Sequence, residues 1–518
     1  MKDKILYKKH RTLRRLAGVL VFLLLFFAAA AWTDCSLPQL WARRAHLTDI
    51  VSGLFPPDWG YFSHIWKPLL ATIQMSVTGT GLGAALALLL APVCARNLRG
   101  SRPLGAICRA LIQILRSFPA LILALLATFL LGLGTFAGTT ALTLYTFAIL
   151  TRLTYEDIEN TSTDAYDALC SLGTSPAAAF SRGILPGIAP SYLSNVLYLL
   201  ETNVRNSSIL GYVGAGGIGL LLDEKMSWLE YGKVGTILLA LFVTVCVIEQ
   251  LSLYLGSLIR GERRVSPAVS RGLALTAVAV FIFCTLTLAP PDFSHTSATL
   301  LRNMLSGLTH PDWSFFFQAD SGGLGYLLLE TVAISLVGTC VGALIALPLA
   351  FLSSPRFLPR PAAALFRLFT LLIRSVPFMI YGLIFIRVSG PGAFTGVLTL
   401  SVCSVGLLTK RFSEAIDALD FRPFQALRAL GVAPLPALCR AVLPQCLPGF
   451  ASAVLYRFDV NIREASVLGL VGAGGIGAPL IYAMNQYKWS TAGAICLGLI
   501  LLVWLVDLLS ARLRRSLD

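Results

Sequence analysis

Long runs of apolar residues alternate with short polar connections along the whole chain of 518 residues. A helix needs roughly 20 apolar residues to cross the hydrocarbon core of a bilayer, which is about 30 Å thick. Twelve runs reach or approach that length, and each predicts a membrane-spanning helix. They lie at residues 16–32, 69–94, 107–131, 136–152, 188–210, 233–258, 271–289, 327–352, 365–388, 393–409, 446–468 and 489–510.

The composition agrees with this pattern. Apolar residues make up 56% of the chain and charged residues 13%, with a mean hydropathy of +0.76. A soluble domain carries about 25% charged residues. The sequence therefore predicts an all-α, polytopic membrane protein.

Lysine and arginine predict how the spans are oriented, because positive residues in short loops are retained in the cytoplasm. The segment before the first span is strongly basic, and so are the loops after the second, sixth and eighth spans and the C-terminal segment. We therefore expect both termini on the cytoplasmic side of a bacterial inner (plasma) membrane. The net charge of +15 is then a topology signal, and we expect no nucleic-acid partner.

The N-terminus has a second interpretation. A basic start followed by an apolar core and "AAAAW" at 28–32 is also typical of a cleavable signal peptide. The repeat described next has a counterpart of this segment at 271–289, which would not be cleaved. We therefore favour a first membrane span.

The chain repeats itself. "VGAGGIG" occurs at 213–219 and again at 471–477, 258 positions later. The same offset links further pairs, namely "LRSFP" (115–119) with "IRSVP" (373–377) and "NVR" (203–205) with "NIR" (461–463). Each copy holds six predicted spans, an even number, so both copies enter the membrane in the same direction. We predict two parallel repeats, at 1–265 and 266–518.

The duplicated glycine segment fits the pattern G-x-G-x-x-G of dinucleotide-binding loops. The predicted topology places both copies outside the cell, and neither is followed by the strand, helix and distant acid of a dinucleotide fold. Glycine also permits sharp turns and close approach of two backbones. A structural turn and a substrate contact both remain open for Gly214, Gly216, Gly217, Gly219, Gly472, Gly474, Gly475 and Gly477.

Two long polar loops, 153–187 and 411–445, lie on the predicted cytoplasmic side. Gly173 and Gly431 are placed to end one short helix in a left-handed turn, and a proline three residues later can open the next helix. The pattern predicts a helix-turn-helix bracket in each copy. Such a pair is suited to docking a two-fold symmetric soluble partner.

These brackets resemble the cytoplasmic EAA signature of ABC importer permeases, which couples the permease to its ATPase. The residues that match are Asp167, Ala168, Gly173, Leu185, Pro186, Gln425, Ala426, Gly431, Leu443 and Pro444. Asp167 and Gln425 stand where the family has glutamate. "RSFP", "RSVP", the paired "N-[VI]-R", "LGLVGAGGIG" (468–477) and "PPDW" are similar to the phosphonate branch of that family.

The resemblance implies a MetI-like permease fold, two cytoplasmic ATPase subunits and an external phosphonate-type binding protein. Family members are usually single repeats that pair as homodimers, whereas this chain resembles two such subunits fused. The chain has no G-x-x-x-x-G-K-[ST] motif, so the ATPase is expected on a separate polypeptide. The implied activity is ATP-driven, inward alternating-access transport of a phosphonate or a related oxyanion such as phosphite.

Charged residues within predicted spans are costly and often functional. Glu201 with Arg205, and Asp459 with Arg463, are spaced to form ion pairs within one helix. Alternatively, the two arginines, together with Asn203 and Asn461, bind a phosphorus oxyanion, since guanidinium donates paired hydrogen bonds to such oxygens. A second candidate pair along the substrate pathway is Arg116 and Arg374, in the third span of each copy. Pro119 and Pro377 are expected to bend those helices.

Other function classes are less well supported. The five histidines lie in tails and predicted external loops, and no C-x-x-C occurs, so we expect no metal, no cofactor and no enzyme chemistry. The alternatives are an ABC permease for methionine or a quaternary amine, and an ion-coupled secondary transporter. Apart from its protein partners, the chain is expected to contact membrane lipid.

Overall fold

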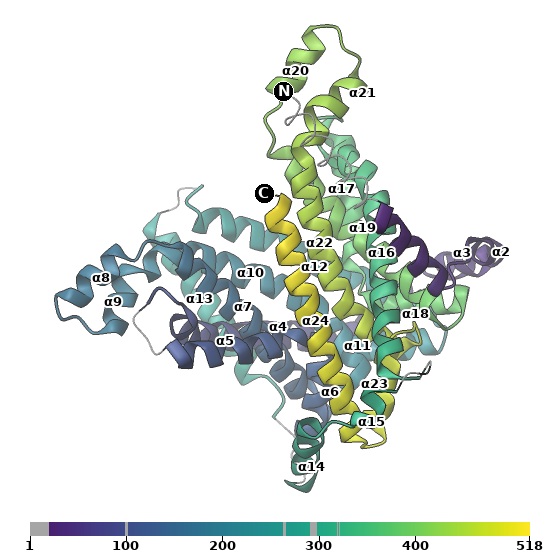
Figure 1. The fold of residues 1–518 in the computed structure, drawn as a ribbon, viewed down its shortest axis with the longest axis horizontal. Coiled ribbons are helices and arrows are strands. Elements are labelled where there is room, and N and C mark those ends of the chain that lie inside the picture. The colour runs from purple at the N-terminus through teal and green to yellow at the C-terminus, as the bar shows by residue number, and fades with distance from the viewer. Residues whose placement is uncertain are drawn as a thin grey trace, which may run out of the picture. The chain divides into compact units, whose positions relative to one another are not determined.

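The computed structural model describes residues 20–98, 102–262, 266–290, 298–318, 320 and 322–517. Every regular element in these ranges is a helix (Figure 1). The basic residues of the N-terminal segment, from Lys2 to Arg15, lie outside the described residues, as do Arg99, Arg263 and Arg264. The prediction of an all-α chain is confirmed for the part described.

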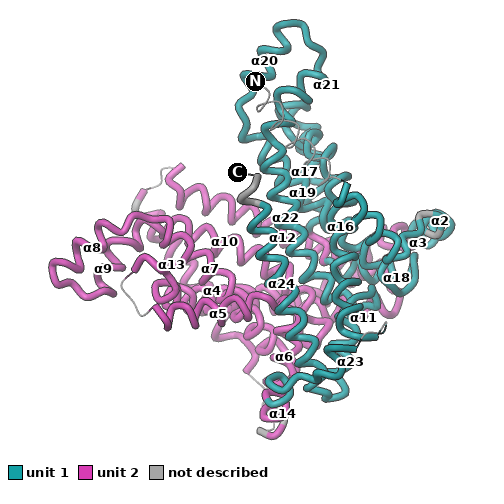
Figure 2. Tube along the Cα trace, viewed as in Figure 1, with its two compact units in different colours: residues 1–49, 306–374, 378–518 teal, residues 50–305, 375–377 magenta. Residues whose placement is uncertain are grey.

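Contacts divide the chain into two compact units, coloured separately in Figure 2. One comprises residues 50–305 and 375–377, and the other residues 1–49, 306–374 and 378–518. We call them the first-copy unit and the second-copy unit, after the sequence copy that supplies most of each. Three of the helices described straddle the division: α3 (Arg44–Gly53), α14 (Ala298–Thr309) and, by its last residue, α17 (Arg360–Ser375).

The helices of the first-copy unit are η1 (Trp59–Tyr61), α4 (Phe62–Cys94), α5 (Arg102–Ser117), α6 (Ala120–Leu131), α7 (Thr135–Asn160), α8 (Asp164–Ser171), α9 (Pro176–Gly183), α10 (Leu185–Leu210), η2 (Gly211–Val213), α11 (Ile218–Ser227), α12 (Tyr231–Ile259) and α13 (Pro267–Leu286). Those of the second-copy unit are a helix at Leu20–Trp32, α2 (Leu37–Ala42), α15 (Trp313–Phe316), α16 (Leu324–Ser353), α17 (Arg360–Ser375), α18 (Phe378–Ser389), α19 (Ala393–Asp417), α20 (Arg422–Ala429), α21 (Pro434–Ala437), η4 (Leu438–Val442), α22 (Leu443–Leu468), η5 (Gly469–Val471), α23 (Gly477–Asn485) and α24 (Trp489–Leu517).

The two units repeat the same element order. Helices α5 and α17 have 16 residues each, α6 and α18 have 12, and α10 and α22 have 26, with bounds 258 positions apart. The duplication seen in the sequence is thus also a duplication of structure in these helices. How the two copies are oriented in the membrane stays a prediction.

Within the described residues, seven helices are long and apolar enough to cross a membrane, or up to ten if each bent pair counts as one span. These ten correspond to ten of the twelve predicted spans. The exceptions are the helix at Leu20–Trp32, which is short within the described residues, and α7. Helix α7 is 26 residues long, but it is rich in threonine, whose hydroxyls lower its hydropathy.

Two predicted spans are not straight helices. The chain bends by 94° between α5 and α6 and by 83° between α17 and α18. Pro119 and Pro377 stand at the breaks. The helices break there because proline lacks the amide hydrogen that continues a helix, and because it forces the preceding residue away from helical geometry. Each predicted span, 107–131 and 365–388, is a pair of helices joined at the bend expected from its proline.

The first helix of each pair is amphipathic. On α5 the exposed apolar residues Leu104, Ile107, Leu111 and Ile114 follow the helical period, and on α17 the exposed residues Leu365, Leu368, Phe369 and Leu372 do the same. A helix with one apolar face and few charges on it is suited to lying in the membrane interface. These faces fit the predicted contact with lipid.

Small residues allow the central helices of each unit to pack closely. A Cβ atom at Gly83 of α4 would lie 2.7 Å from Cβ of Thr146 on α7, and one at Gly342 of α16 would lie 2.4 Å from Cβ of Ser404 on α19. Glycines four positions earlier, Gly79 and Gly338, make the same kind of approach. This spacing is the one that brings helices together in membranes.

The first predicted span of each copy groups with helices of the other copy. Helix α13 packs on α4, where a Cβ at Gly81 would lie 2.3 Å from the Phe281 ring, and Gln74 donates to Thr287 Oγ1 at 2.9 Å. The helix at Leu20–Trp32 belongs to the second-copy unit, where the Trp32 ring contacts Tyr326. The boundaries predicted from the repeat, 1–265 and 266–518, follow the sequence duplication and not this exchange.

Candidate functional site

A band of polar side chains crosses the C-terminal half of α10 and of α22. It includes six predicted pathway residues, and each unit holds its own set. Asn203 and Asn461 are fully buried, while Glu201 and Asp459 are 7% and 6% exposed. Buried polar groups on otherwise apolar helices must find partners, because an unpaired one is costly in a low-dielectric interior.

The asparagines hold three helices together in each unit. Asn203 Nδ2 donates to Thr80 Oγ1 of α4 at 2.8 Å and to Thr146 Oγ1 of α7 at 2.7 Å. Asn461 Nδ2 donates in the same way to Thr339 Oγ1 of α16 at 2.7 Å and to Ser404 Oγ of α19 at 2.9 Å. Both amide hydrogens of each asparagine are thus directed to neighbouring helices. This arrangement gives the asparagines a structural role.

The arginines pair with acids one turn earlier on the same helix. Arg205 Nη1 lies 2.7 Å from Glu201 Oε1, and Arg463 Nη2 lies 2.7 Å from Asp459 Oδ2. The arginine side chains are 19% and 16% exposed, whereas the side chains of the paired acids, taken without their backbone, are 8% and 9% exposed. Each arginine side chain is therefore the more exposed member of its pair.

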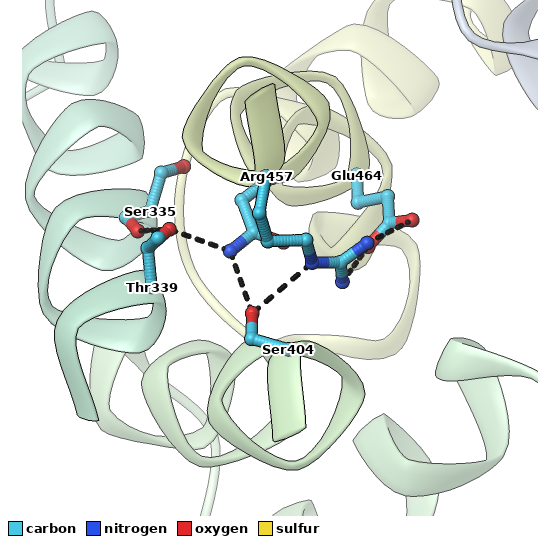
Figure 3. A network of polar contacts seen from close by, with 6 residues as sticks. Ser335, Thr339, Ser404, Arg457 and Glu464 are labelled. Atoms are coloured by element: carbon cyan, nitrogen blue, oxygen red, sulfur yellow. Dashed lines mark hydrogen bonds and ion pairs between the residues drawn. The ribbon is translucent and has the colours of Figure 1, made fainter. Parts of the chain in front are cut away.

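The second-copy unit has a further ion pair (Figure 3). Arg457 Nη2 and Nη1 donate to the two oxygens of Glu464 at 2.8 and 3.4 Å, and Arg457 Nε donates to Ser404 Oγ at 3.1 Å. The Arg457 side chain is 3% exposed, so this guanidinium is sealed within the unit. Leu199 and Asn206 stand at the equivalent positions of the first copy, and the two polar bands are not equivalent.

The other candidate arginines lie at the bends. Arg116 and Arg374 occupy the last turns of α5 and α17, where a positive charge is favourable beside the negative end of the helix dipole. Arg116 Nη2 donates to Gln113 Oε1 at 3.3 Å. The backbone and Cβ of Arg374 pack against Gly406 of α19.

The glycine segments form a tight turn after α10 and after α22. Gly214 and Gly472 are left-handed, with φ of 76° and 72°, and their carbonyl oxygens accept from the amides of Gly134 and Gly392 at 2.9 Å. A Cβ at Gly219 or Gly477 would lie 2.2 or 2.5 Å from a backbone oxygen of the preceding helix. The turn itself requires these glycines, whatever else they contact.

Sequence reasoning missed the residues that hold this turn. Thr72 Oγ1 accepts from the Ile218 amide at 2.8 Å, and Thr331 Oγ1 accepts from the Ile476 amide at 3.1 Å. Both threonines lie in the duplicated sequence at an offset of 259, which could have identified them. Glu330 is present in one copy only, where its Oε2 accepts from the Gly475 amide at 3.1 Å.

The predicted brackets are observed in both units, as α8–α9 and as α20–α21–η4. Gly173 and Gly431 are left-handed, with φ of 85° and 81°. The Gly173 amide donates to Cys170 O and the next amide to Leu169 O, and the equivalent two bonds surround Gly431. This is the Schellman motif. Pro176 and Pro434 open the following helices, as predicted.

Other residues of the matched signature lie on the bracket surface or at its base. Ala168, Gln425 and Ala426 are exposed, and Asp167 is half-buried. Leu185-Pro186 and Leu443-Pro444 form the first turns of α10 and α22. The brackets differ here, because α9 bends by 70° from α10 while α21, η4 and α22 run on as one helix.

Each bracket is joined to the transmembrane helices by an apolar cluster. In the first-copy unit, Tyr166 of α8 and Ala179 of α9 are buried with Ala91 of α4 and Ile158 of α7. In the second-copy unit, Val442 and Cys446 are buried with Phe412 and Ala350. Because packed interiors deform little, a force on the bracket reaches these helices directly.

A charged cluster follows α11 in the first-copy unit. Lys225 Nζ lies 2.8 Å from Glu224 Oε1 and 3.2 Å from Glu230 Oε2, and these contacts raise the pKa of Lys225. Lys233 donates to Glu230 at 2.8 Å, and with Lys225 it lowers the pKa of that carboxyl.

Among the residues that the structure describes, no group of three or more His, Cys, Asp or Glu side chains is arranged to hold a metal ion.

Comparison with known proteins gives a family and several relatives. The family model described as "binding-protein-dependent transport system inner membrane component" matches residues 79–255 and 342–518. The phosphate-import permease protein PhnE of Mycolicibacterium smegmatis is 29% identical over 91% of this chain and 89% of its own length. The phosphite transport system permease protein PtxC of Stutzerimonas stutzeri is 40% identical over 36% of this chain and 69% of its own.

A solved structure of the MetNI methionine ABC transporter is also similar. It is 21% identical and covers 43% of this chain and 99% of its own length, with a TM-score of 0.34. At that score the likeness adds nothing to the assignment, which rests on the family match in both copies.

Proposed function

Because this chain belongs to the family of binding-protein-dependent transport system inner membrane components, we propose that it moves a phosphorus oxyanion, such as phosphonate or phosphite, into the cell. The chain is a transport permease of an ABC importer and not an enzyme. It is a multi-pass inner-membrane protein that works with an ATPase and a substrate-binding protein.

The substrate class rests on one observation. The relative that matches over 91% of the chain is named for phosphate import, and the relative at 40% identity is named for phosphite transport. A probable D-methionine permease of Vibrio cholerae is 31% identical, over 30% of this chain. The longer and closer matches favour a tetrahedral phosphorus oxyanion over an amino acid.

We propose that Arg205 and Arg463 line the substrate pathway. Each is the accessible member of an ion pair, and a guanidinium binds phosphorus oxyanions through paired hydrogen bonds. In this proposal the substrate takes the place of Glu201 or Asp459 as the partner of the arginine. Arg457 is sealed by Glu464 and Ser404, and is assigned a structural role.

The partner assignment is more specific than the family alone. We propose two cytoplasmic ATPase subunits, one for each bracket, and an external binding protein of the phosphonate type. Both chain termini are then cytoplasmic, as the distribution of lysine and arginine predicts. The duplicated brackets support this stoichiometry, since each offers one docking surface.

Uptake into proteoliposomes tests the substrate class. The purified permease, its ATPase and its binding protein are reconstituted, and ATP-driven uptake of labelled phosphite is measured with competing methylphosphonate, phosphate or methionine. We expect competition from the phosphorus oxyanions and none from methionine. Strong competition by methionine, or uptake that needs an ion gradient and no ATP, would contradict the proposal.

The role of the arginines is tested by removing both charges of a pair. Glu201→Gln/Arg205→Gln and Asp459→Gln/Arg463→Gln leave no unpaired buried acid, so the fold is preserved. Loss of a charged hydrogen bond costs about 1.5–3 kcal/mol, so uptake should fall roughly tenfold or more. Arg302→Gln, on the exposed surface of α14, is the control. Full uptake by both double variants would remove these arginines from the pathway.

A further inference from the structure

The two brackets share the Schellman turn and differ in charge. Arg422 stands at the position of Asp164, Arg428 at that of Cys170, and Arg440 at that of Arg182, each 258 positions apart. The second bracket therefore carries three arginines, while the first carries two acids and one arginine. A partner that docks on both meets two different electrostatic surfaces.

The apolar part of the surface is shared. Leu172 and Leu430 occupy equivalent positions just before the Schellman glycine, and are 83% and 79% exposed. Figure 1 shows both brackets, α8–α9 and α20–α21, extending beyond the long helices of their own units. Large exposed leucines at projecting turns are suited to insertion into a groove of a partner. The charges that differ lie on the helices of the same brackets.

The three arginines of the second bracket differ in the contacts that they make within the protein. Arg422 is the first residue of α20 and its side chain is 88% exposed. A positive charge is unfavourable at a helix N-terminus. Asp420 offsets it in part, since its Oδ1 accepts from the Arg422 amide at 3.0 Å and from Nε at 3.2 Å.

Arg440 is also exposed, whereas Arg428 has a local role. Its Nη1 donates to Val432 O at 2.8 Å and so closes the turn around Gly431. Arg422 and Arg440 therefore offer positive charge to a partner. Asp164, in contrast, accepts from Ser162 Oγ at 2.8 Å. It stands at the N-terminus of α8, where an acid is favourable.

We infer that the second bracket, α20–α21–η4, is the main electrostatic anchor for an ATPase whose docking groove is lined with acids, while the first bracket docks mainly through its apolar tip. This inference rests on the proposed function. Complementary charges raise association rates and specificity. Exposed charges act over about 8 Å at physiological ionic strength, which is within reach of a docked groove.

Anionic lipid is the competing occupant for these arginines, since juxtamembrane clusters of lysine and arginine bind acidic headgroups. The exposed leucine tip favours a protein groove. Each bracket is also held on an apolar cluster with the transmembrane helices, which suits force transmission from a bound protein. Lipid binding is kept as an outcome of the test.

The test measures binding of the separately purified partner ATPase to the full-length permease in nanodiscs, at low and high NaCl. In the second bracket, Arg422→Glu/Arg440→Glu should weaken binding about tenfold at low salt, because two attractions become repulsions. In the first bracket, Asp164→Arg changes the position equivalent to Arg422 and should strengthen binding a few-fold. Both effects should shrink at high salt. Arg428 is left unchanged, so the turn stays intact.

Three results would overturn the inference. Equal weakening by both changes would mean that each bracket meets its own complementary groove. No change in either variant would mean that docking is apolar alone. An effect seen only in nanodiscs with phosphatidylglycerol, and lost in neutral lipid, would assign the arginines to lipid. Failure of the ATPase to bind wild-type permease would instead contradict the proposed function itself, and this inference with it.

Discussion

The amide of Asn461 shows how a residue that looks functional in the sequence acquires a structural role. Both of its Nδ2 hydrogens are directed to hydroxyls of other helices, at 2.7 and 2.9 Å, and Asn203 repeats the arrangement. Interhelical hydrogen bonds inside a membrane contribute about 0.6–2 kcal/mol each. The asparagines thus position α10 and α22, and through them the ion-paired arginines two residues further along each helix.

Replacing this residue should therefore lower stability. Asn461→Leu loses the hydrogen bonds to Thr339 and Ser404, at a cost of about 1–3 kcal/mol. We expect a lower midpoint of thermal unfolding in detergent. The control is Thr202→Val on α10, whose hydroxyl bonds only within its own helix, to Tyr198 O. A substrate-binding role alone would reduce uptake and leave the unfolding midpoint unchanged.

At the scale of elements, the short segments between helices carry most of the specific geometry. The Schellman turns shape the brackets, the glycine turns close α10 and α22, and capped turns tie the sixth helix of each copy to an earlier loop. In the second-copy unit, the Asp312 amide donates to Ser490 O, and in the first-copy unit the Asp58 amide donates to Gly232 O at the equivalent place. These ties are duplicated although the surrounding side chains differ.

The Asp312 cap gives a pH dependence with a definite sign. Its carboxylate accepts from the Ser314 hydroxyl and from the amides of Phe315 and Ser314, which lowers its pKa. A lowered pKa means that this carboxylate stabilises the fold above its unfolded pKa of about 3.9. That contribution is lost as pH falls through the folded pKa.

We therefore expect wild type to unfold at a higher temperature than Asp312→Asn at pH 7. The two unfolding midpoints should converge at pH values below the folded pKa of Asp312. Ser314→Ala, which removes the largest cause of the shift, should behave in the same direction. A difference between wild type and Asp312→Asn that stays constant across the whole pH range would show that the charge of Asp312 does not matter.

At the scale of the whole molecule, the duplication provides both halves of a permease in one chain. Each copy has its own polar band, glycine turn and bracket, and the copies have diverged at Arg457, Glu464, Glu330 and the bracket charges. A fused chain allows such divergence, because each change occurs once per complex, whereas a homodimer would receive it twice. Fusion therefore allows the two copies to differ from each other within one complex.

The stoichiometry of the complex follows from this organisation. We expect native mass spectrometry to find one permease chain of 55.7 kDa with two ATPase subunits, since one chain offers two brackets. Disrupting one bracket, by replacing Gly431 and Leu430 together, should reduce the ATPase count to one. Two permease chains in each complex would contradict the expectation that a single chain forms the whole pathway.

The sequence by itself determined the features that depend on local pattern: the apolar runs, the repeat at an offset of 258, the glycines that end α8 and α20, and the family. Helical period, turn chemistry and hydropathy act over a few residues, so they can be read without a structure.

Only the tertiary structure decided where each polar group finds its partner. It showed that Asn203 and Asn461 bond to neighbouring helices and that α13 packs on α4. These outcomes depend on residues far apart in the chain, whose distances no local pattern contains. Burial then fixes the result, because a polar group inside the membrane is stable only where a partner reaches it.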